Sequence, residues 1–335
     1  MATLVSNPTT VTVTLPGTSA LAILAATMPS NSWADFMIGS LTSSVVSASG
    51  PSVPSLLTYA ARANWDPIHK RMQFAGTSHT GGVVISGAGG LITWDDTTNQ
   101  VTRESYSWSS ENPGHSYYHT TVNQSNGNMY FRSYNSASIY RRVFGQTGQS
   151  SWAAGVVANH PNPANQVAGG LEWFNELNGG AGGLVFIDCL SVNWSNAALT
   201  SWTAKTGFNS GNYQNWCTRA GGSVYFGGGS GSTAMYRLSS SGTVSSMPST
   251  PLVAGPAEQG IVLAHPNGND LLLFQSGTAS GSIYRFNGSS WAGAGTHKIN
   301  TSDFWVGCTI PEYGVILFLV HPTGSGTPSI RVYKA

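Results

Sequence analysis

Short apolar segments centred on phenylalanine recur along the chain, separated by stretches rich in Gly, Asn and Pro. Their length and mostly apolar composition are those of β-strands that are buried on both faces. The six segments are RMQFAG (71–76), NMYFRS (128–133), GLVFID (183–188), SVYFGG (223–228), LLLFQS (271–276) and VILFLV (315–320). The repeated pattern, together with the absence of a long helical apolar period, predicts an all-β protein built from similar units.

Each segment sits within a larger repeat of turns and strands. Asn-Gly and Gly-Gly pairs, which suit tight β-hairpins, precede several segments, as in NQSNGN (123–128). A strand with an aromatic residue follows, such as SIYRRV (138–143), and then a strand that often bears Trp, such as SSWAAG (150–155). The phenylalanines recur roughly every 40 to 57 residues, which is the length of one four-stranded propeller blade. We therefore predict a six-bladed β-propeller with four-stranded blades.

The sixth repeat lacks a fourth strand, because the sequence ends directly after IRVYKA (330–335). The segment NSWADF (31–36) carries Trp33, which matches the tryptophans of the other fourth strands. We expect this N-terminal strand to complete the sixth blade, cover its exposed edge and close the ring. The prediction divides the chain into an N-terminal arm, residues 1–28, and a propeller, residues 29–335.

One repeat carries a more specific pattern. WDDTTNQV (94–101) resembles the aromatic-Asp-x-x-Thr-Asn-x-aromatic segment of kelch repeats, and Gly227-Gly228 matches their Gly-Gly doublet. The resemblance covers the architecture from about residue 30 onward and implies a kelch-like propeller. In such a fold the Phe and Trp series fills the apolar layers between blades and does not form an aromatic binding box.

Composition narrows the classes of function. Only 8% of the residues are charged and the formal net charge is +1, with no cluster of Lys or Arg, so we expect no nucleic-acid partner. No segment is apolar for the roughly 18 to 20 residues of a membrane helix, so we expect no membrane insertion. The first residues lack Lys and Arg and contain Pro8 and Pro16, which is not the pattern of a signal peptide. Three widely spaced cysteines, Cys189, Cys217 and Cys308, predict buried free thiols.

The densest group of polar and aromatic side chains is SWSSENPGHSYYHTT, where the first repeat passes into the second. It supplies the predicted ligand-binding residues Trp108, His115, Tyr117, Tyr118 and His119. Two His and two Tyr can bind copper, as in propellers similar to galactose oxidase. However, histidines four apart on an extended strand do not lie side by side. We therefore predict no metal and no cofactor, and favour stacking on a glycan or packing between loops.

Catalytic motifs are missing from the sequence. It contains no Gly-x-Ser-x-Gly elbow, no phosphate-binding GxxxxGK[ST] loop and no HExxH. Acidic residues that can furnish a carboxylate pair for glycoside hydrolysis are Glu111, Glu172, Glu176, Asp188 and Asp303. With 13 acidic residues in total, we expect most of them in turns and caps, and we predict no catalytic residue.

The low charge, the abundance of Gly, Ser, Thr and Asn, and the Pro-containing arm are similar to virion proteins of tailed bacteriophages. This resemblance implies a structural protein of the tail or head surface, such as a tail fibre or capsid decoration protein, made in the host cytoplasm. In the arm, Val11, Val13 and Leu15 alternate with threonines, so one apolar face can pack on other virion proteins. The propeller face would then bind a host receptor or glycan.

Two alternatives remain open. The first is an enzyme, either a carbohydrate-active propeller or a copper-dependent oxidase. The second is a cellular lectin or a kelch-like adaptor.

Overall fold

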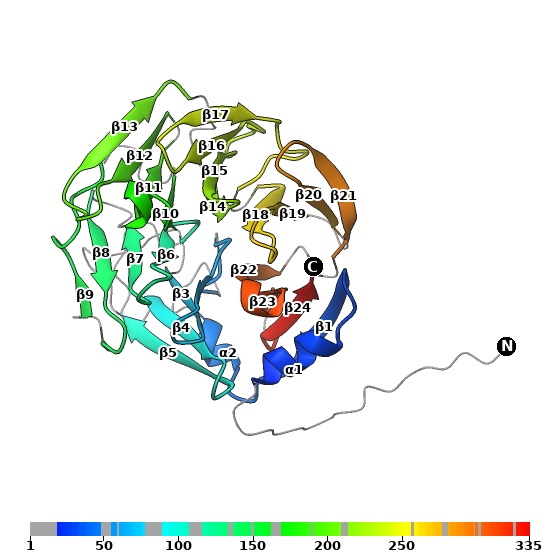
Figure 1. Ribbon diagram of the computed structural model, residues 1–335. Helices are drawn as coiled ribbons and strands as arrows, with labels where there is room; N and C mark the ends of the chain where they lie inside the picture. Colours follow the sequence, from blue (N-terminus) through cyan, green and yellow to red (C-terminus); the bar gives the residue numbers. More distant parts are fainter. Residues whose placement is uncertain are drawn as a thin grey trace, which may run out of the picture.

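Six four-stranded antiparallel sheets are arranged as blades around a central axis in the computed structural model (Figure 1). This arrangement confirms the predicted all-β, six-bladed propeller. The structure describes residues 19–47, 55–58, 60–77, 89–106, 116–132, 137–148, 151–161, 169–188, 190–208, 214–255, 258–276, 281–297, 299–300, 303–323 and 326–335.

Each blade is numbered in chain order, with its innermost strand first. Blade one contains β2 (Asn64–Asp66), β3 (Arg71–Thr77), β4 (Gly89–Asp95) and β5 (Gln100–Tyr106). Blade two contains β6 (Thr120–Val122), β7 (Met129–Arg132), β8 (Ile139–Arg142) and β9 (Trp152–Ala153). Blade three contains β10 (Gly170–Phe174), β11 (Gly183–Ile187), β12 (Ser191–Ser195) and β13 (Trp202–Thr206).

The other three blades follow the same order. Blade four contains β14 (Trp216–Ala220), β15 (Ser223–Gly227), β16 (Met235–Ser239) and β17 (Val244–Met247). Blade five contains β18 (Gly260–Ala264), β19 (Leu271–Gln275), β20 (Ser282–Phe286) and β21 (Trp291–Thr296). Blade six contains β22 (Phe304–Ile310), β23 (Val315–His321), β24 (Ser329–Lys334) and, at its outer edge, β1 (Ser32–Phe36).

The repeated phenylalanine segments form the second strand of every blade: β3, β7, β11, β15, β19 and β23. A second strand has a partner on each side within its sheet and a neighbouring blade on each face, which explains its mostly apolar sequence. The six phenylalanines are all buried: Phe74, Phe131, Phe186, Phe226, Phe274 and Phe318. The prediction that they pack between blades is confirmed.

The outer strand of blade six comes from the N-terminal part of the chain. β1 pairs antiparallel with β24, with Trp33 opposite Tyr333 and Phe36 opposite Ile330. The rings of Trp33 and Tyr333 lie 5.0 Å apart between centroids. The segment of residues 31–36 therefore provides the fourth strand that the sequence of the sixth repeat lacks. That this strand holds the ring together stays a prediction.

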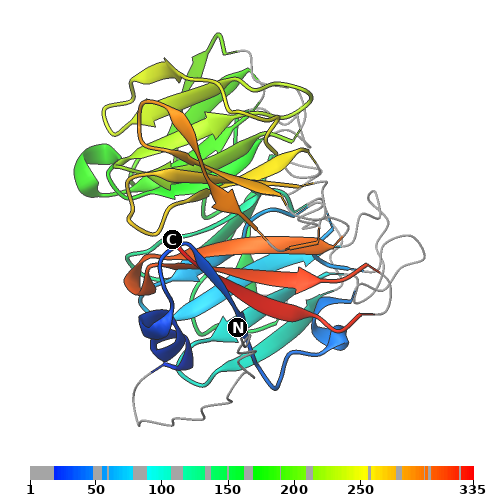
Figure 2. The same cartoon turned by 90° about the vertical axis from the view of Figure 1, so that its right-hand side faces the viewer.

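Two short helices flank β1 and join blade six to blade one. α1 (Ala20–Thr27) packs against the 3-10 turn η3 (Pro311–Tyr313) of blade six, and the Ser19 hydroxyl that caps it also hydrogen-bonds Asp96 of blade one. α2 (Ser43–Val46) packs beside β5 of blade one. The views in Figures 1 and 2 place α1 and α2 at opposite faces of the ring. Residues 20–27 belong to the predicted arm, and this helix was not predicted from the sequence.

The rest of the predicted arm, including Val11, Val13 and Leu15, lies outside the described residues. Two of the three cysteines, Cys217 and Cys308, are buried free thiols as predicted, and Cys189 lies outside the described residues. No helix in the described part of the chain has the length and apolar character to span a membrane.

Candidate functional site

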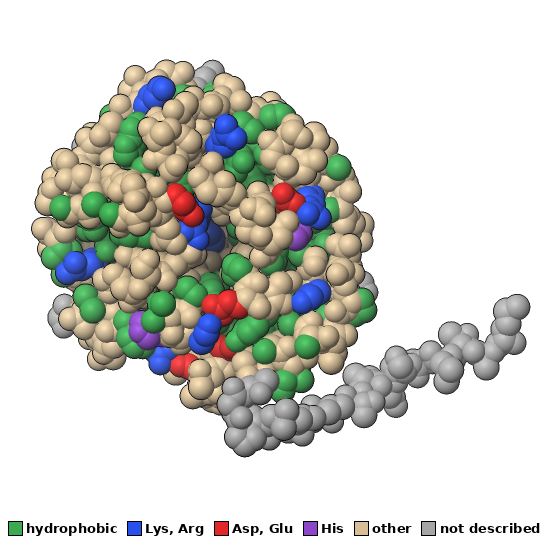
Figure 3. All heavy atoms as spheres, viewed as in Figure 1, with side chains coloured by type: hydrophobic (Ala, Val, Ile, Leu, Met, Phe, Trp, Pro, Cys, Tyr) green, Lys and Arg blue, Asp and Glu red, His purple; other side chains and the backbone are tan. Residues whose placement is uncertain are grey.

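A pocket opens on the axis of the propeller, at the centre of the face seen in Figure 3. The innermost strands of adjacent blades contact each other all around the ring: β2, β6, β10, β14, β18 and β22. Near these strands, isolated β-bridges join neighbouring blades in parallel. Residues near the ends of these strands therefore converge on the axis. The pocket has a volume of about 170 Å³ and is lined by residues from all six blades. Its polar lining includes Asn64, Thr121, Gln124, Glu172, Thr218 and His265.

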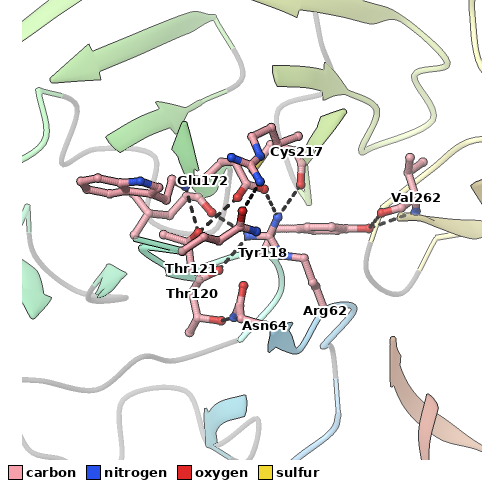
Figure 4. A network of polar contacts seen from close by, with 12 residues as sticks. Arg62, Asn64, Tyr118, Thr120, Thr121, Glu172, Cys217 and Val262 are labelled. Carbon is pink, nitrogen blue, oxygen red and sulfur yellow. Dashed lines mark hydrogen bonds and ion pairs between the residues drawn. The ribbon is translucent and has the colours of Figure 1, made fainter. Parts of the chain in front are cut away.

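Arg62 occupies the centre of this convergence, just before β2 (Figure 4). Its guanidinium group donates from Nη2 to the carbonyl oxygens of Thr120 and Leu171, both at 2.7 Å. Nη1 donates to the carbonyl oxygen of Cys217 at 3.0 Å and pairs with the Glu172 carboxylate. One side chain from blade one thus contacts blades two, three and four across the axis.

The charge on Arg62 is stable despite its burial. Desolvation is the largest influence and lowers the pKa of Arg62, but the adjacent Glu172 carboxylate together with Cys217 and Tyr118 outweighs it, so that the pKa lies above its usual value. The guanidinium carbon also lies 5.3 Å from the centre of the Tyr118 ring, where a cation is attracted to the face of the aromatic system. Arg62 is therefore a permanent cation held by a carboxylate, three carbonyls and a ring.

Tyr118 extends the network to blade five. Its hydroxyl donates to the carbonyl oxygen of Val262 at 2.9 Å and accepts from the Val262 amide at 3.0 Å, as Figure 4 shows. Burial raises the pKa of Tyr118 well above its usual value. The tyrosine is therefore neutral, and its hydroxyl is occupied by the backbone of the opposite side of the ring.

The predicted ligand-binding cluster lies in the segment that leads into β6. Tyr117, Tyr118 and His119 are all fully buried, and the rings of Tyr117 and His119 meet edge to face at 5.4 Å. None of the three lines the axial pocket, although Tyr118 supports Arg62, which does. Trp108 and His115 lie outside the described residues. The structure thus shows how the buried members pack, and ligand binding by this cluster stays a prediction.

Two of the acidic residues that the sequence analysis noted meet at the axial pocket. Glu172 is bound by Arg62, and the Glu176 carboxylate lies 3.8 Å from the Arg219 guanidinium, which also donates to Gln124. Each carboxylate thus has an arginine partner, and the two ion pairs carry no net charge. The remaining described candidates have the expected turn roles: Asp188 accepts from the backbone and hydroxyl of Ser191, and Asp303 accepts from the Thr323 amide.

His265 lines the pocket from the hairpin after β18. Its Nδ1 accepts a hydrogen bond from the Asn267 amide at 3.1 Å, which leaves the ring proton on Nε2. Burial and the nearby Arg285 cation lower the pKa of His265. The ring therefore presents a neutral N–H donor near pH 7. No group of three or more His, Cys, Asp or Glu side chains within the described ranges is placed to hold a metal ion.

The fold and this site together define a six-bladed β-propeller with a polar axial pocket. No known family model and no curated protein matches the chain. Among solved structures, the chain is similar to a catalytically inactive variant of virginiamycin B lyase from Staphylococcus aureus with quinupristin. The TM-score is 0.50 and the sequence identity is 11%, and the match covers 90% of this chain and 99% of that chain. The selenomethionine-substituted lyase from the same organism gives a TM-score of 0.47, 14% identity and coverage of 81% and 79%. At 11% identity, the likeness to the inactive variant supports the propeller fold alone.

Proposed function

We propose that this protein is a non-enzymatic binding propeller whose axial pocket takes a neutral, hydroxyl-rich ligand such as one sugar ring of a glycan. The observation that carries the proposal is the lining of the pocket, which combines balanced ion pairs with hydrogen-bonding groups from every blade. Sugar hydroxyls donate and accept at once. The pocket offers an acceptor in the side-chain oxygen of Asn64, whose amide nitrogen is bound to Thr120, and a donor in the side-chain nitrogen of Gln124, whose oxygen is bound to Arg219.

The charge and size of the pocket support a small neutral ligand. Two arginines and two glutamates cancel, so the pocket has no excess charge to concentrate a polyanion or a polycation. Its volume of about 170 Å³ is below the roughly 300 to 1,000 Å³ of pockets for drug-sized molecules. Trp65 adds a narrow apolar edge to the lining, since its side chain is 5% exposed and packs against Trp94 and Tyr313.

The glycosidase alternative gains little support from the same residues. A glycosidase needs two carboxyl groups with separate tasks, one of which keeps its proton in apolar surroundings. At this pocket Glu172 is engaged by Arg62, and Glu176 faces Arg219. Both carboxylates are therefore held by cations, which fits a role in shaping the pocket better than a role in proton transfer.

We propose further that the protein is a virion component of a tailed bacteriophage, anchored through its N-terminal arm and used in host attachment. Support comes from the composition, with 8% charged residues and 41 glycines, and from the apolar alternation in the arm. Val11→Asp combined with Val13→Asp places two charges on the apolar face of the arm, where each would have to be desolvated without a partner. We expect this variant to fold and to be missing from purified particles. Its normal incorporation would contradict the anchoring role.

The binding function is tested on a glycan array with two charge-matched variants. Arg219→Met removes a cation at the pocket, whereas Lys205→Met removes an exposed cation on β13 of blade three. We expect the wild type and Lys205→Met to bind the same glycans and Arg219→Met to lose at least about tenfold in affinity, the equivalent of about 1.4 kcal/mol. Bound glycans should be recovered unchanged. An array without hits for the wild type, equal binding by both variants, or release of a cleaved product would each reject the proposal.

A further inference from the structure

A second cavity adjoins the axial pocket at the seam between blades five and six. It has a volume of about 370 Å³. Its lining comes from the hairpin after β18, from β19, β20, β21 and β24, from the turn after β20 and from the residue before β1. Its polar members are Asn31, His265, Arg285, Asn287 and Tyr333. His265 lines both this seam cavity and the axial pocket, so its ring lies at the wall between them.

The seam cavity exists because the outer strand of blade five carries small side chains and a bulge. β21 has the sequence WAGAGT, and Ala292, Gly293 and Ala294 line the cavity. Gly295 pairs with Ile283 whereas Gly293 pairs with Tyr284, so Ala294 is an extra residue in the ladder. Such a bulge bends a strand locally. A Cβ atom added at Gly293 would meet nothing within 4 Å, which shows that open space lies beside the strand.

Like the axial pocket, the seam cavity is lined by a cation balanced by an anion and by neutral hydrogen-bonding groups. The Arg285 Nε donates to the Asp270 carboxylate at 2.7 Å, so this cation is also balanced by an anion. The Tyr333 hydroxyl donates to the Asn31 side chain at 3.0 Å, which leaves its oxygen free to accept and the Asn31 amide free to donate. The cavity therefore offers neutral donors and acceptors, as a second sugar ring would require.

His265 provides the observation that points to a ligand. The side chain is 8% exposed, and its Nδ1 is used by the Asn267 amide. Nε2 has no hydrogen-bond partner among the residues that the structure describes, and this atom is not closed off from solvent. An accessible N–H donor without a protein partner can bind a hydroxyl of a ligand in place of water. At the wall between two cavities, this donor can bind a group that passes from one cavity to the other.

We propose that the ligand is an oligosaccharide of at least two units, with one ring in the axial pocket, the next in the seam cavity, and His265 hydrogen-bonded at the junction. The proposal rests on the function proposed above and specifies the length of the glycan. A longer saccharide should bind more tightly than a single unit, because the second ring fills the seam cavity and gains the Nε2–H donor.

The test compares chain lengths by isothermal titration calorimetry. The probes are the methyl glycosides of glucose, galactose, mannose and N-acetylglucosamine, and the corresponding disaccharides and trisaccharides. Ala294→Leu fills the seam cavity, and Ala204→Leu makes the same change on exposed β13 as the matched control. His265→Ala removes the donor at the junction and provides a second variant that does not depend on added bulk. Thermal melts establish that each variant is folded.

In the wild type and Ala204→Leu, we expect the disaccharide of the preferred sugar to bind at least about tenfold more tightly than the methyl glycoside. Ala294→Leu and His265→Ala should each lose most of this gain, and Ala294→Leu should keep wild-type affinity for the single unit. If the methyl glycoside binds but longer saccharides bind no better, or if both variants keep the gain, the two-cavity proposal is wrong and the binding function stands. If no saccharide of any length binds the wild type, both proposals are rejected.

Discussion

Arg62 is the residue whose removal most directly tests the architecture of the axis. Arg62→Met keeps an unbranched stem and removes the cation that four acceptors share: the Glu172 carboxylate and the carbonyl oxygens of Thr120, Leu171 and Cys217. The Glu172 side chain is only 12% exposed, so water does not replace the lost partner. The variant therefore leaves a buried anion without a cation, with a hydrogen bond from the Thr121 hydroxyl as its remaining described partner.

The expected loss follows from the burial of the pair. Removing one partner of a buried ion pair costs about 3 to 5 kcal/mol, because the other charge remains desolvated. The entropy of unfolding is about 2.1 cal/mol/K per residue, or about 0.7 kcal/mol/K for a chain of 335 residues. A loss of about 4 kcal/mol therefore corresponds to a fall of about 6 °C in Tm. In the double variant Arg62→Met with Glu172→Leu both charges are absent, and we expect about half of the loss to be recovered.

The measurement is thermal unfolding at pH 7, followed by calorimetry and by circular dichroism. Lys70→Met serves as the control, because the ion pair of Lys70 with Glu312 lies at the surface, where such pairs contribute about 0 to 1 kcal/mol. We expect a fall in Tm of less than about 1.5 °C for this control. A fall of similar size for Arg62→Met, or no recovery in the double variant, would refute the view that this ion pair holds the blades around the axis.

Four further predictions concern closure, packing, the cross-axis hydrogen bonds and the thiols. Deleting residues 1–18 should leave a folded propeller, whereas deleting residues 1–36 removes the outer strand of blade six and should lower Tm sharply; equal melting of the two truncations would show that the strand does not hold the ring together. Phe131→Ala should destabilise by about 3 to 5 kcal/mol in chemical denaturation, because the ring is fully buried, and a loss below about 1 kcal/mol would contradict this packing. Tyr118→Phe leaves one backbone donor and one acceptor of blade five buried without partners, so we expect a loss of about 1 to 3 kcal/mol in the same assay. Burial raises the pKa of Cys217 to about 12, so in a background without the other two cysteines this thiol should not react with a disulfide reagent at pH 8 until the protein is unfolded; rapid labelling of the native protein would contradict its burial.

The architecture could be predicted because its strongest determinant is local in the sequence. A second strand with neighbours on both faces must be apolar at successive positions, and the Phe segments show this directly. The match between Trp33 and the other tryptophans also located β1, since an outer strand shares its pattern with its equivalents in other blades. The helix α1 was missed because ALAILAAT is apolar on all sides and lacks the period of an amphipathic helix. The kelch-like resemblance of residues 94–101 stays a prediction.

The candidate site could not be found in the same way. The sequence analysis selected the segment with the most polar and aromatic residues, and its described members, Tyr117, Tyr118 and His119, pack inside the ring. Arg62 has no motif around it, and β2 and β6 are only three residues long. Its partners lie 58, 109, 110 and 155 residues away in the sequence. The sequence signal for this site was the position of polar residues relative to the first strand of each blade. Residues near the end of every first strand must meet on the axis of the propeller.

Because the innermost strands converge on the axis, the same side chains line the pocket and stabilise the fold. Arg62 lines the pocket and at the same time contacts three other blades, and Glu172 lines the pocket while it compensates that cation. Changes at these two positions would therefore alter affinity and stability together. Arg219, Gln124 and His265 line the pocket from short hairpins or strand ends and do not connect so many blades. Ligand specificity can change at these outer positions at a lower cost to the fold, so we expect related propellers to keep the Arg–Glu pair at the axis and to differ at the rim.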